Sequence, residues 1–285
     1  MTLTTRFAPS PTGPLHLGHA YSALLAHDLA TAAGGDFLLR IEDIDQSRAR
    51  AHWEAQIYED LAWLGIDWPQ PVMRQSDRMA AYQAALDALW SRGLLYACTC
   101  NRRDIAAATS APQEGAEPVY GPDGLIYPGT CRTAGHPKSS GALRLDMRKA
   151  LETLGNTKLS FTENGQGPNA ETGKITLSSD QLIDTVGDVV LARRDMGTSY
   201  HLSVVLDDAA QGVTLVPRGA DLFEATYIHV VLQALLALPT PLYHHHRLIR
   251  DDSGKRLAKR DDARAIALYR ENGATPDEIR ETVGL

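Results

Sequence analysis

The sequence predicts an α/β protein in which a Rossmann-type, doubly wound parallel sheet is split by an inserted subdomain. Apolar strand-like runs alternate with amphipathic helices over residues 1–95, and the same alternation returns over residues 181–250. Between them, residues 96–180 interrupt the pattern with long stretches rich in Gly, Pro and polar residues. Strands that alternate with helices of this length form parallel sheets, and ligands of such sheets bind at the carboxyl ends of the strands.

The first strand ends at Arg6–Ala8, and a rigid loop separates it from the first helix. Prolines at positions 9, 11 and 14 exclude regular structure in this loop, because each fixes φ. A helical pattern of apolar residues follows and ends at Gly34–Gly35. His16 and His19 lie at the start of this helix, where unpaired N–H groups and a partial positive charge suit a phosphate. Gly18 between them lacks a Cβ and allows a flat ligand to approach the backbone.

The remaining elements are expected in chain order. The first half continues with a strand at 36–41 and helices at 48–65 and 79–90. Strands at 94–100 and 142–147 are expected in the insertion, with loops at 106–128 and 155–173. The second half is expected to contain strands at 188–192, 212–216 and 243–249 and helices at 200–207 and 220–238. Residues 251–285 are expected to form a basic loop and two short helices.

Two motifs carry a resemblance to a known family. His16-Leu17-Gly18-His19, after a Pro-rich strand end, resembles the first ATP-binding motif of class I aminoacyl-tRNA synthetases. The strings at 6–13 (RFAPSPTG) and 40–45 (RIEDID) narrow the resemblance to the glutamyl branch. Far downstream, Arg256-Leu257-Ala258-Lys259-Arg260 stands where that family has a basic Lys-Met-Ser-Lys-Ser loop, although Ala258 replaces a serine that many relatives carry.

The resemblance implies that an amino-acid carboxylate attacks the α-phosphate of ATP, with Mg²⁺ accompanying the nucleotide. It assigns catalysis to His16, His19 and Lys259, and ATP binding to these three with Gly18 and Arg256. It implies a glutamate pocket in which Glu42 binds the ammonium group and arginines bind the side-chain carboxylate, for which their forked donors are suited. The residues implied for this pocket are Arg6, Ala8, Ser10, Glu42, Tyr200 and Arg218.

The three cysteines predict free thiols or a metal site rather than disulfides, because their number is odd and two are spaced as Cys98-x-Cys100. If Cys131 joins Cys98 and Cys100, the three thiolates would need a cation between them, and zinc is the usual one. Resemblance to short glutamyl-synthetase paralogues implies Tyr127 as the fourth ligand of one structural zinc ion, while His136 is the chemical alternative. Three reduced, partly buried cysteines without metal remain the competing interpretation.

Net charge and hydropathy bear on the expected binding partners and on the cellular location. A formal charge of −7 is not typical of a nucleic-acid binder, yet residues 246–264 hold a local cluster of Lys and Arg. No apolar run approaches the length of a membrane span, and the first four residues are not a signal peptide. We therefore expect a cytoplasmic protein; we also expect it to be a monomer.

Glutamyl synthetases normally continue into an anticodon-binding domain, whereas this sequence ends soon after Arg260. No such domain is expected, and the resemblance is strongest to the truncated paralogue group, the glutamyl-queuosine tRNA(Asp) synthetases. That group implies tRNA-independent activation of glutamate and transfer to queuosine at the wobble position of tRNA(Asp). Three alternatives stay open: a glutamyl-tRNA synthetase acting on the tRNA 3′ end, a nucleotidyltransferase of the same superfamily, and a zinc-stabilised RNA-binding paralogue with weakened catalysis.

Overall fold

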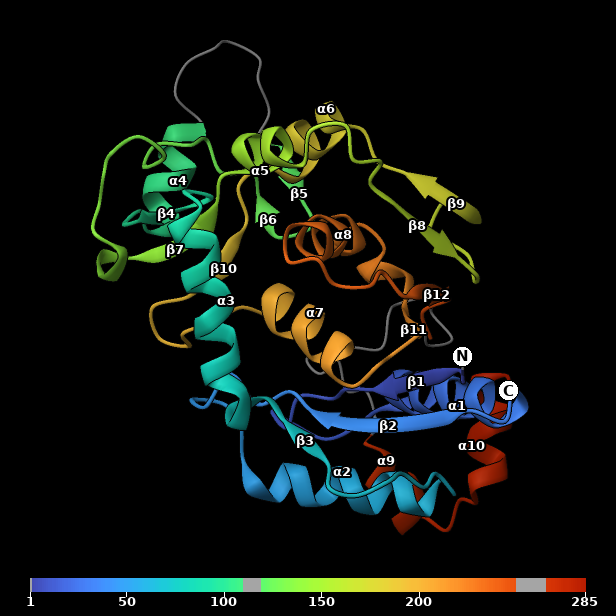
Figure 1. Cartoon of the computed structure of the whole chain (residues 1–285). Helices are drawn as coiled ribbons and strands as arrows, with labels where there is room; N and C mark the ends of the chain where they lie inside the picture. Colours follow the sequence, from blue (N-terminus) through green and yellow to red (C-terminus); the bar gives the residue numbers. More distant parts are fainter. Residues whose placement is uncertain (1, 110–118, 250–264) are drawn as a thin grey trace.

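The computed structural model describes residues 2–109, 119–249 and 265–285 (Figure 1). Its first half is a parallel sheet in the order β1-β2-β3, formed by Thr4–Phe7, Asp36–Ile41 and Met73–Arg74. Helices α1 (Leu17–Ala32) and α2 (Ala51–Trp63) share one hydrophobic core with this sheet. The two terminal helices, α9 (Ile266–Glu271) and α10 (Pro276–Val283), contribute Ile266 and Ile279 to the same core.

The second half is a four-stranded sheet in the order β11-β12-β8-β9. These strands are Leu215–Gly219, Leu242–His246, Ser160–Glu163 and Gly173–Thr176, and β9 alone runs antiparallel to its neighbour. Helices α7 (Tyr200–Ala210) and α8 (Ala225–Leu235) supply most of its core. The two sheets meet at Thr214, whose N–H donates to the Thr4 carbonyl at 2.9 Å and whose hydroxyl accepts from Thr4 N–H at 2.8 Å.

A third sheet, which is antiparallel, lies at the upper left of Figure 1 and includes strands from inside and outside the predicted insertion. Its strands follow the order β10-β7-β4, formed by Val190–Ala192, Ala142–Leu145 and Leu95–Cys98. Helix α3 (Met79–Ser91) runs from the first half up to this sheet. Around it lie α4 (Arg102–Thr109), α5 (Met147–Leu154) and the small hairpin of β5 (Tyr120–Gly121) and β6 (Gly124–Leu125).

Short helices complete the chain: Gln75–Arg78, Lys138–Ser140, α6 (Ser179–Gln181), Leu182–Val186 and Ala220–Leu222. Among the described residues, no helix combines the length and the apolar character that crossing a bilayer requires.

Most predicted elements are confirmed, and the strand at 36–41 has the predicted bounds. The loop predicted at 155–173 was wrong, because Ser160–Glu163 forms β8 and pairs with β12. The loop predicted from residue 106 was wrong in its first residues, because α4 continues to Thr109. The single helix predicted at 220–238 is a short helix followed by α8, which begins at Ala225. Since β8 and β9 join the second-half sheet, the insertion limits of 96–180 stay a proposal.

Candidate active site

His16 and His19 sit at the first turn of α1, and each ring accepts a backbone N–H. Gly18 N–H donates to His16 Nδ1 at 3.1 Å, and His16 N–H donates to His19 Nδ1 at 3.2 Å. The two ring centroids are 3.8 Å apart. A neutral imidazole that accepts at Nδ1 carries its proton on Nε2. Both side chains are therefore donors through Nε2–H, at a helix N-terminus that already favours anions.

Gly18 has a structural reason in addition to the close ligand approach expected from the sequence. A Cβ at this position would lie 3.1 Å from Cε1 and 3.2 Å from Nδ1 of His16. These separations are shorter than ordinary van der Waals contact, so a side chain here would displace the ring. The glycine thus lets the His16 imidazole lie back against the helix start.

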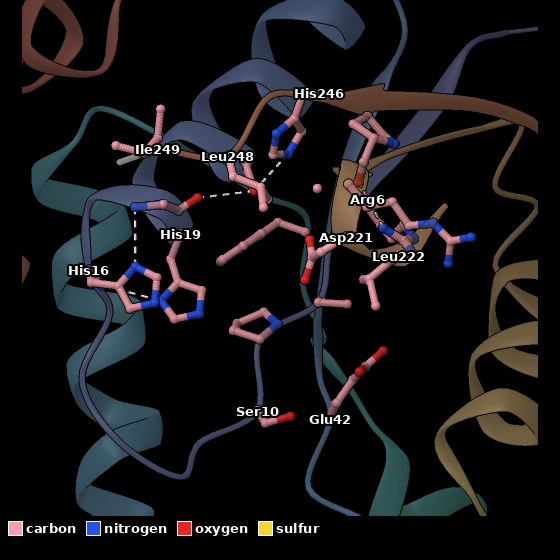
Figure 2. A pocket seen from close by; sticks show the side chains of 18 of the residues that line it. Arg6, Ser10, His16, His19, Glu42, Asp221, Leu222, His246, Leu248 and Ile249 are labelled. Atoms are coloured by element: carbon pink, nitrogen blue, oxygen red, sulfur yellow. Dashed lines mark hydrogen bonds between the residues drawn. The ribbon is translucent and has the colours of Figure 1, made fainter. Parts of the chain in front are cut away.

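One cavity of about 610 Å³ brings the two predicted sites together. It opens at the carboxyl ends of β1, β2, β11 and β12, as expected for a doubly wound fold. The sequence-predicted residues that line it are Arg6, Ala8, Ser10, His16, Gly18, His19, Glu42, Tyr200 and Arg218. Figure 2 shows His16 and His19 on one side of the cavity and Arg6, Glu42 and Leu222 on the other. Arg256, Ala258 and Lys259 lie outside the described residues.

A buried network of charged side chains holds Arg6 and Glu42, two residues of the expected glutamate pocket, in place. Asp208 of α7 accepts from Arg6 Nε at 3.1 Å and from Arg40 Nη1 at 2.7 Å. Arg40 has no exposed surface and also donates to Glu42 Oε1 at 3.1 Å. Burial would raise the pKa of Asp208, but Arg6 and Arg40 hold it below its ordinary value. At Glu42 burial prevails over the same two arginines and raises the pKa of the carboxyl.

The side chain of the neighbouring Asp207, on the same helix, contacts a different set of residues. Its carboxylate accepts from Arg78 at 2.7 Å, from the Tyr82 hydroxyl at 2.7 Å and from Gln75 at 2.9 Å. Two consecutive aspartates of α7 therefore connect the first-half sheet and the α3 region at one point.

Arg218, at the end of β11, is held by three neutral acceptors. Its Nε donates to His245 Nε2 at 3.1 Å, its Nη1 to His229 Nδ1 at 3.2 Å and its Nη2 to Thr226 Oγ1 at 2.5 Å. Because arginine only donates, both histidine nitrogens facing it are unprotonated. Burial, reinforced by the Arg218 charge, keeps the pKa of His229 well below its ordinary value.

The tautomers that Arg218 imposes on His245 and His229 determine the next hydrogen bond of each ring. His245 then carries its proton on Nδ1 and donates to Glu163 Oε2 at 2.5 Å, between two side chains with no exposed surface. His229 carries its proton on Nε2 and donates to His201 Nδ1 at 3.2 Å. The His201 proton consequently lies on Nε2, which is 3.6 Å from Asp123 Oδ1.

The histidine triplet at 244–246 does not form a metal site, which agrees with the alternation expected in a strand. His245 faces Arg218 and Glu163, whereas His246 Nε2 lies 2.9 Å from the Ser22 hydroxyl of α1. Across residues 2–109, 119–249 and 265–285, the only cluster with metal-binding geometry is Cys98, Cys100 and Cys131.

The three cysteine sulfurs all lie within 4.8 Å of one another. Cys100 Sγ is 3.4 Å from Cys131 Sγ and 3.4 Å from the Tyr127 hydroxyl, which also accepts the Cys131 N–H at 2.8 Å. Tetrahedral zinc with Zn–S bonds of about 2.3 Å separates its sulfurs by roughly 3.8 Å, so the observed spacing fits. His136 is not part of this described cluster.

Hydrogen bonds also prepare one thiol for metal binding. Burial alone would raise the pKa of Cys131, but donors from Tyr127 and Thr99 lower it to about 6. At Cys100 burial prevails and raises the pKa to about 11. A cation bound among the three sulfurs would favour the thiolate at each of them.

Comparison with known proteins decides the family. The family described as the catalytic domain of class I tRNA synthetases for Glu and Gln (E and Q) matches residues 2–121 and 157–285. The chain belongs to this family of class I tRNA synthetases. Class I membership implies that the synthetase uses ATP.

The synthetase has relatives that match along almost its whole length. It is 62% identical to the glutamyl-Q tRNA(Asp) synthetase of Rhodobacter capsulatus over 99% of this chain and 100% of the relative. It is 40% identical to the protein of the same name in Geobacter sulfurreducens, over 93% and 78%. The crystal structure of an Elizabethkingia meningosepticum glutamate tRNA ligase with its amino acid has a TM-score of 0.77 and 25% identity. The synthetase covers 61% of that ligase and is itself covered completely.

Sequence reasoning missed the residues that hold the synthetase's arginines. Asp208, His229 and Glu163 contact or orient Arg6 and Arg218, yet none stands in a motif. Asp208 is 202 residues from Arg6 and Glu163 acts through His245 of another strand, whereas His229 lies only 11 residues after Arg218 but on a separate helix. The adjacent aspartates at the end of the helix predicted at 200–207 were the one available signal, because paired carboxylates on a buried helix require cationic partners.

Proposed function

We propose that the synthetase activates glutamate with ATP and transfers it to queuosine at the wobble position of tRNA(Asp). The observation that carries the proposal is the single cavity in which a phosphate-binding helix start faces two buried arginines and one buried glutamate. The names of relatives that match 93–99% of the chain supply the acceptor.

In the first step an oxygen of the glutamate α-carboxylate attacks the α-phosphorus of ATP. The bond from that phosphorus to the bridging oxygen breaks, pyrophosphate leaves and glutamyl-adenylate remains. Charge increases on the phosphate oxygens in the transition state, so preorganised donors there lower the barrier. The Nε2–H groups of His16 and His19 are the donors for this role, and Lys259 is proposed to join them. Mg²⁺ bound to the nucleotide would neutralise phosphate charge.

In the glutamate pocket, Glu42 binds the substrate ammonium and Arg6 with Arg218 binds the γ-carboxylate. Arg6 has Nε on Asp208 and Nη1 on the Pro217 carbonyl at 3.3 Å, so its planar group is fixed before substrate arrives. Arg218 is fixed in the same way by its three acceptors. Ala8, Ser10 and Tyr200 complete the lining. Preorganised arginines favour a carboxylate over an amide of the same shape.

In the second step a hydroxyl of queuosine attacks the activated carbonyl, AMP leaves, and the hydroxyl proton passes to the departing phosphate or to water. This step uses the same carbonyl, so the acceptor nucleotide must reach the cavity in an unstacked form. We propose that activation occurs without tRNA and that the synthetase acts as a cytoplasmic monomer.

A structural zinc ion is proposed on Cys98, Cys100, Cys131 and Tyr127. The support is the convergence of three sulfurs and one phenol oxygen within tetrahedral spacing, in a small core separate from the catalytic cavity. When bound, the ion would supply cross-linking of the insertion and no chemistry to the reaction.

Two assays test the proposal. Pyrophosphate exchange with glutamate, glutamine and aspartate, each without tRNA, should respond to glutamate alone. Labelled glutamate should be incorporated into tRNA(Asp) that contains queuosine. This incorporation should also occur when the terminal adenosine has been removed from the tRNA beforehand. Incorporation that requires the terminal adenosine and ignores queuosine would identify a 3′-end glutamyl-tRNA synthetase instead.

A further inference from the structure

A second cavity, of about 420 Å³, adjoins the active-site cavity. The residues that line both are Ser10, Thr12, Glu42, Arg48, Tyr200 and Leu222. His16, Gly18 and His19 line the first cavity and do not line the second. The second cavity therefore meets the first near Glu42 and Tyr200, and the shared residues Ser10, Glu42 and Leu222 lie away from the two histidines in Figure 2.

The two-step reaction requires a space in this place. An attacking hydroxyl must come within about 3–3.5 Å of the activated carbonyl, which lies between the phosphate donors and the glutamate-binding residues. The volume of the second cavity is in the range of sites that hold small organic groups, roughly 300–1,000 Å³. A nucleoside side chain entering here would approach the carbonyl without crossing the ATP side.

We propose that the second cavity binds the acceptor nucleoside and that the Asp123 carboxylate accepts hydrogen bonds from its hydroxyl or amine groups. This inference rests on the proposed function and extends it to the second substrate. Queuosine carries a cyclopentene diol on a secondary amine, so its side chain is rich in donors and cationic. A carboxylate matches both properties.

Asp123 is held as an anion at the cavity wall. It lies between β5 and β6, and its Oδ2 accepts the Val190 N–H at 3.4 Å. Its Oδ1 is 3.6 Å from the Nε2 of His201, which is turned toward it by the hydrogen bond from His229. Burial by itself raises the pKa of Asp123, but His201 and the Val190 N–H lower it below the ordinary value.

The charges of the cavity favour a donor-rich nucleoside over a phosphate. Arg48 donates to Asp45 at 2.5 Å, so these two charges offset each other. Of the remaining aspartates and arginines in the wall, Asp123 and Asp195 face the single cation Arg193, and this excess of negative charge would repel a phosphate.

The test separates the two half-reactions in the full-length protein. Asp123→Asn keeps the shape of the side chain but removes the charge offered to the nucleoside; its single amide oxygen can accept from Val190 N–H or from His201, and its NH₂ group faces the other. Glutamate-dependent pyrophosphate exchange should stay within about twofold of wild type, because activation precedes acceptor binding. Transfer to queuosine-containing tRNA(Asp) should fall about ten- to hundredfold, the range for a lost charge-assisted hydrogen bond.

Asp184→Asn is the matched control, because Asp184 is exposed and lines neither cavity. A second variant, Met196→Trp, fills the cavity from its wall and should block transfer while exchange persists. Normal transfer by both variants would overturn the inference, and so would an equal loss of exchange and transfer in Asp123→Asn. Failure of the wild-type protein to modify queuosine-containing tRNA would instead refute the proposed function itself.

Discussion

His16 both caps helix α1 and faces the catalytic cavity, and one substitution separates these two roles. In His16→Asn the amide Oδ1 takes the place of Nδ1, which accepts Gly18 N–H at 3.1 Å. Asparagine is among the best N-cap residues, so the free energy of unfolding should change by less than about 0.5 kcal/mol. The Nε2–H donor is lost, because asparagine is too short to place a donor at that position.

If the Nε2–H donates to the phosphate in the transition state, its loss should cost about 3–4 kcal/mol, or 10²–10³-fold in kcat. The assay is glutamate-dependent pyrophosphate exchange at saturating ATP, with urea unfolding measured on the same preparation. His16→Ala is the companion variant, because it removes donor and cap together and should also lose about 1 kcal/mol of stability. Exchange within threefold of wild type in His16→Asn would refute the catalytic role and leave His16 as a cap.

Three further predictions follow from buried groups. Thr226→Val removes an acceptor from Arg218, so the glutamate KM in exchange should rise about ten- to hundredfold, whereas the exposed Thr153→Val should leave it unchanged. Tyr127→Phe should reduce zinc bound per chain, measured by elemental analysis, and lower the melting temperature; undiminished zinc would exclude Tyr127 as a ligand. Burial raises the pKa of Asp60 to about 6, so its carboxylate destabilises the fold above that pH and ceases to do so below its unfolded pKa of about 4. Asp60→Asn should therefore raise the melting temperature by a few degrees at pH 8 and not at pH 4, and a shift independent of pH would contradict this.

The predictable part of the fold was the part set by local pattern. Strand β2 (Asp36–Ile41) is an apolar run bounded by a turn and by acidic residues, and helix α1 has a clear apolar periodicity, so both were predicted. Strand β8 was missed because it is short and contains Ser, Thr and Glu. Glu163 belongs in the interior only because β12, far away in sequence, brings His245 to it.

The candidate site likewise contains residues that the sequence predicted and residues that it did not. His16, Glu42 and Arg218 stood in recognisable strings, and the structure brings them to one cavity. The groups that orient the arginines come from α7, α8 and β8, and only the packing of those elements decides which side chains meet. No local pattern marks His229 as an acceptor for Arg218, because its neutral state follows from burial beside that positive charge.

The Asp208 contact has a consequence for attempts to change amino-acid specificity. Replacing Arg6 with a neutral residue would seem to convert the pocket for glutamine, yet it would remove one of the two cations that balance Asp208 in the interior. The remaining Arg40 already shares its charge with Glu42, so the interior would gain an excess carboxylate. A successful redesign must therefore change Asp208 together with Arg6, and must do so without loosening the Asp207 contacts one residue away.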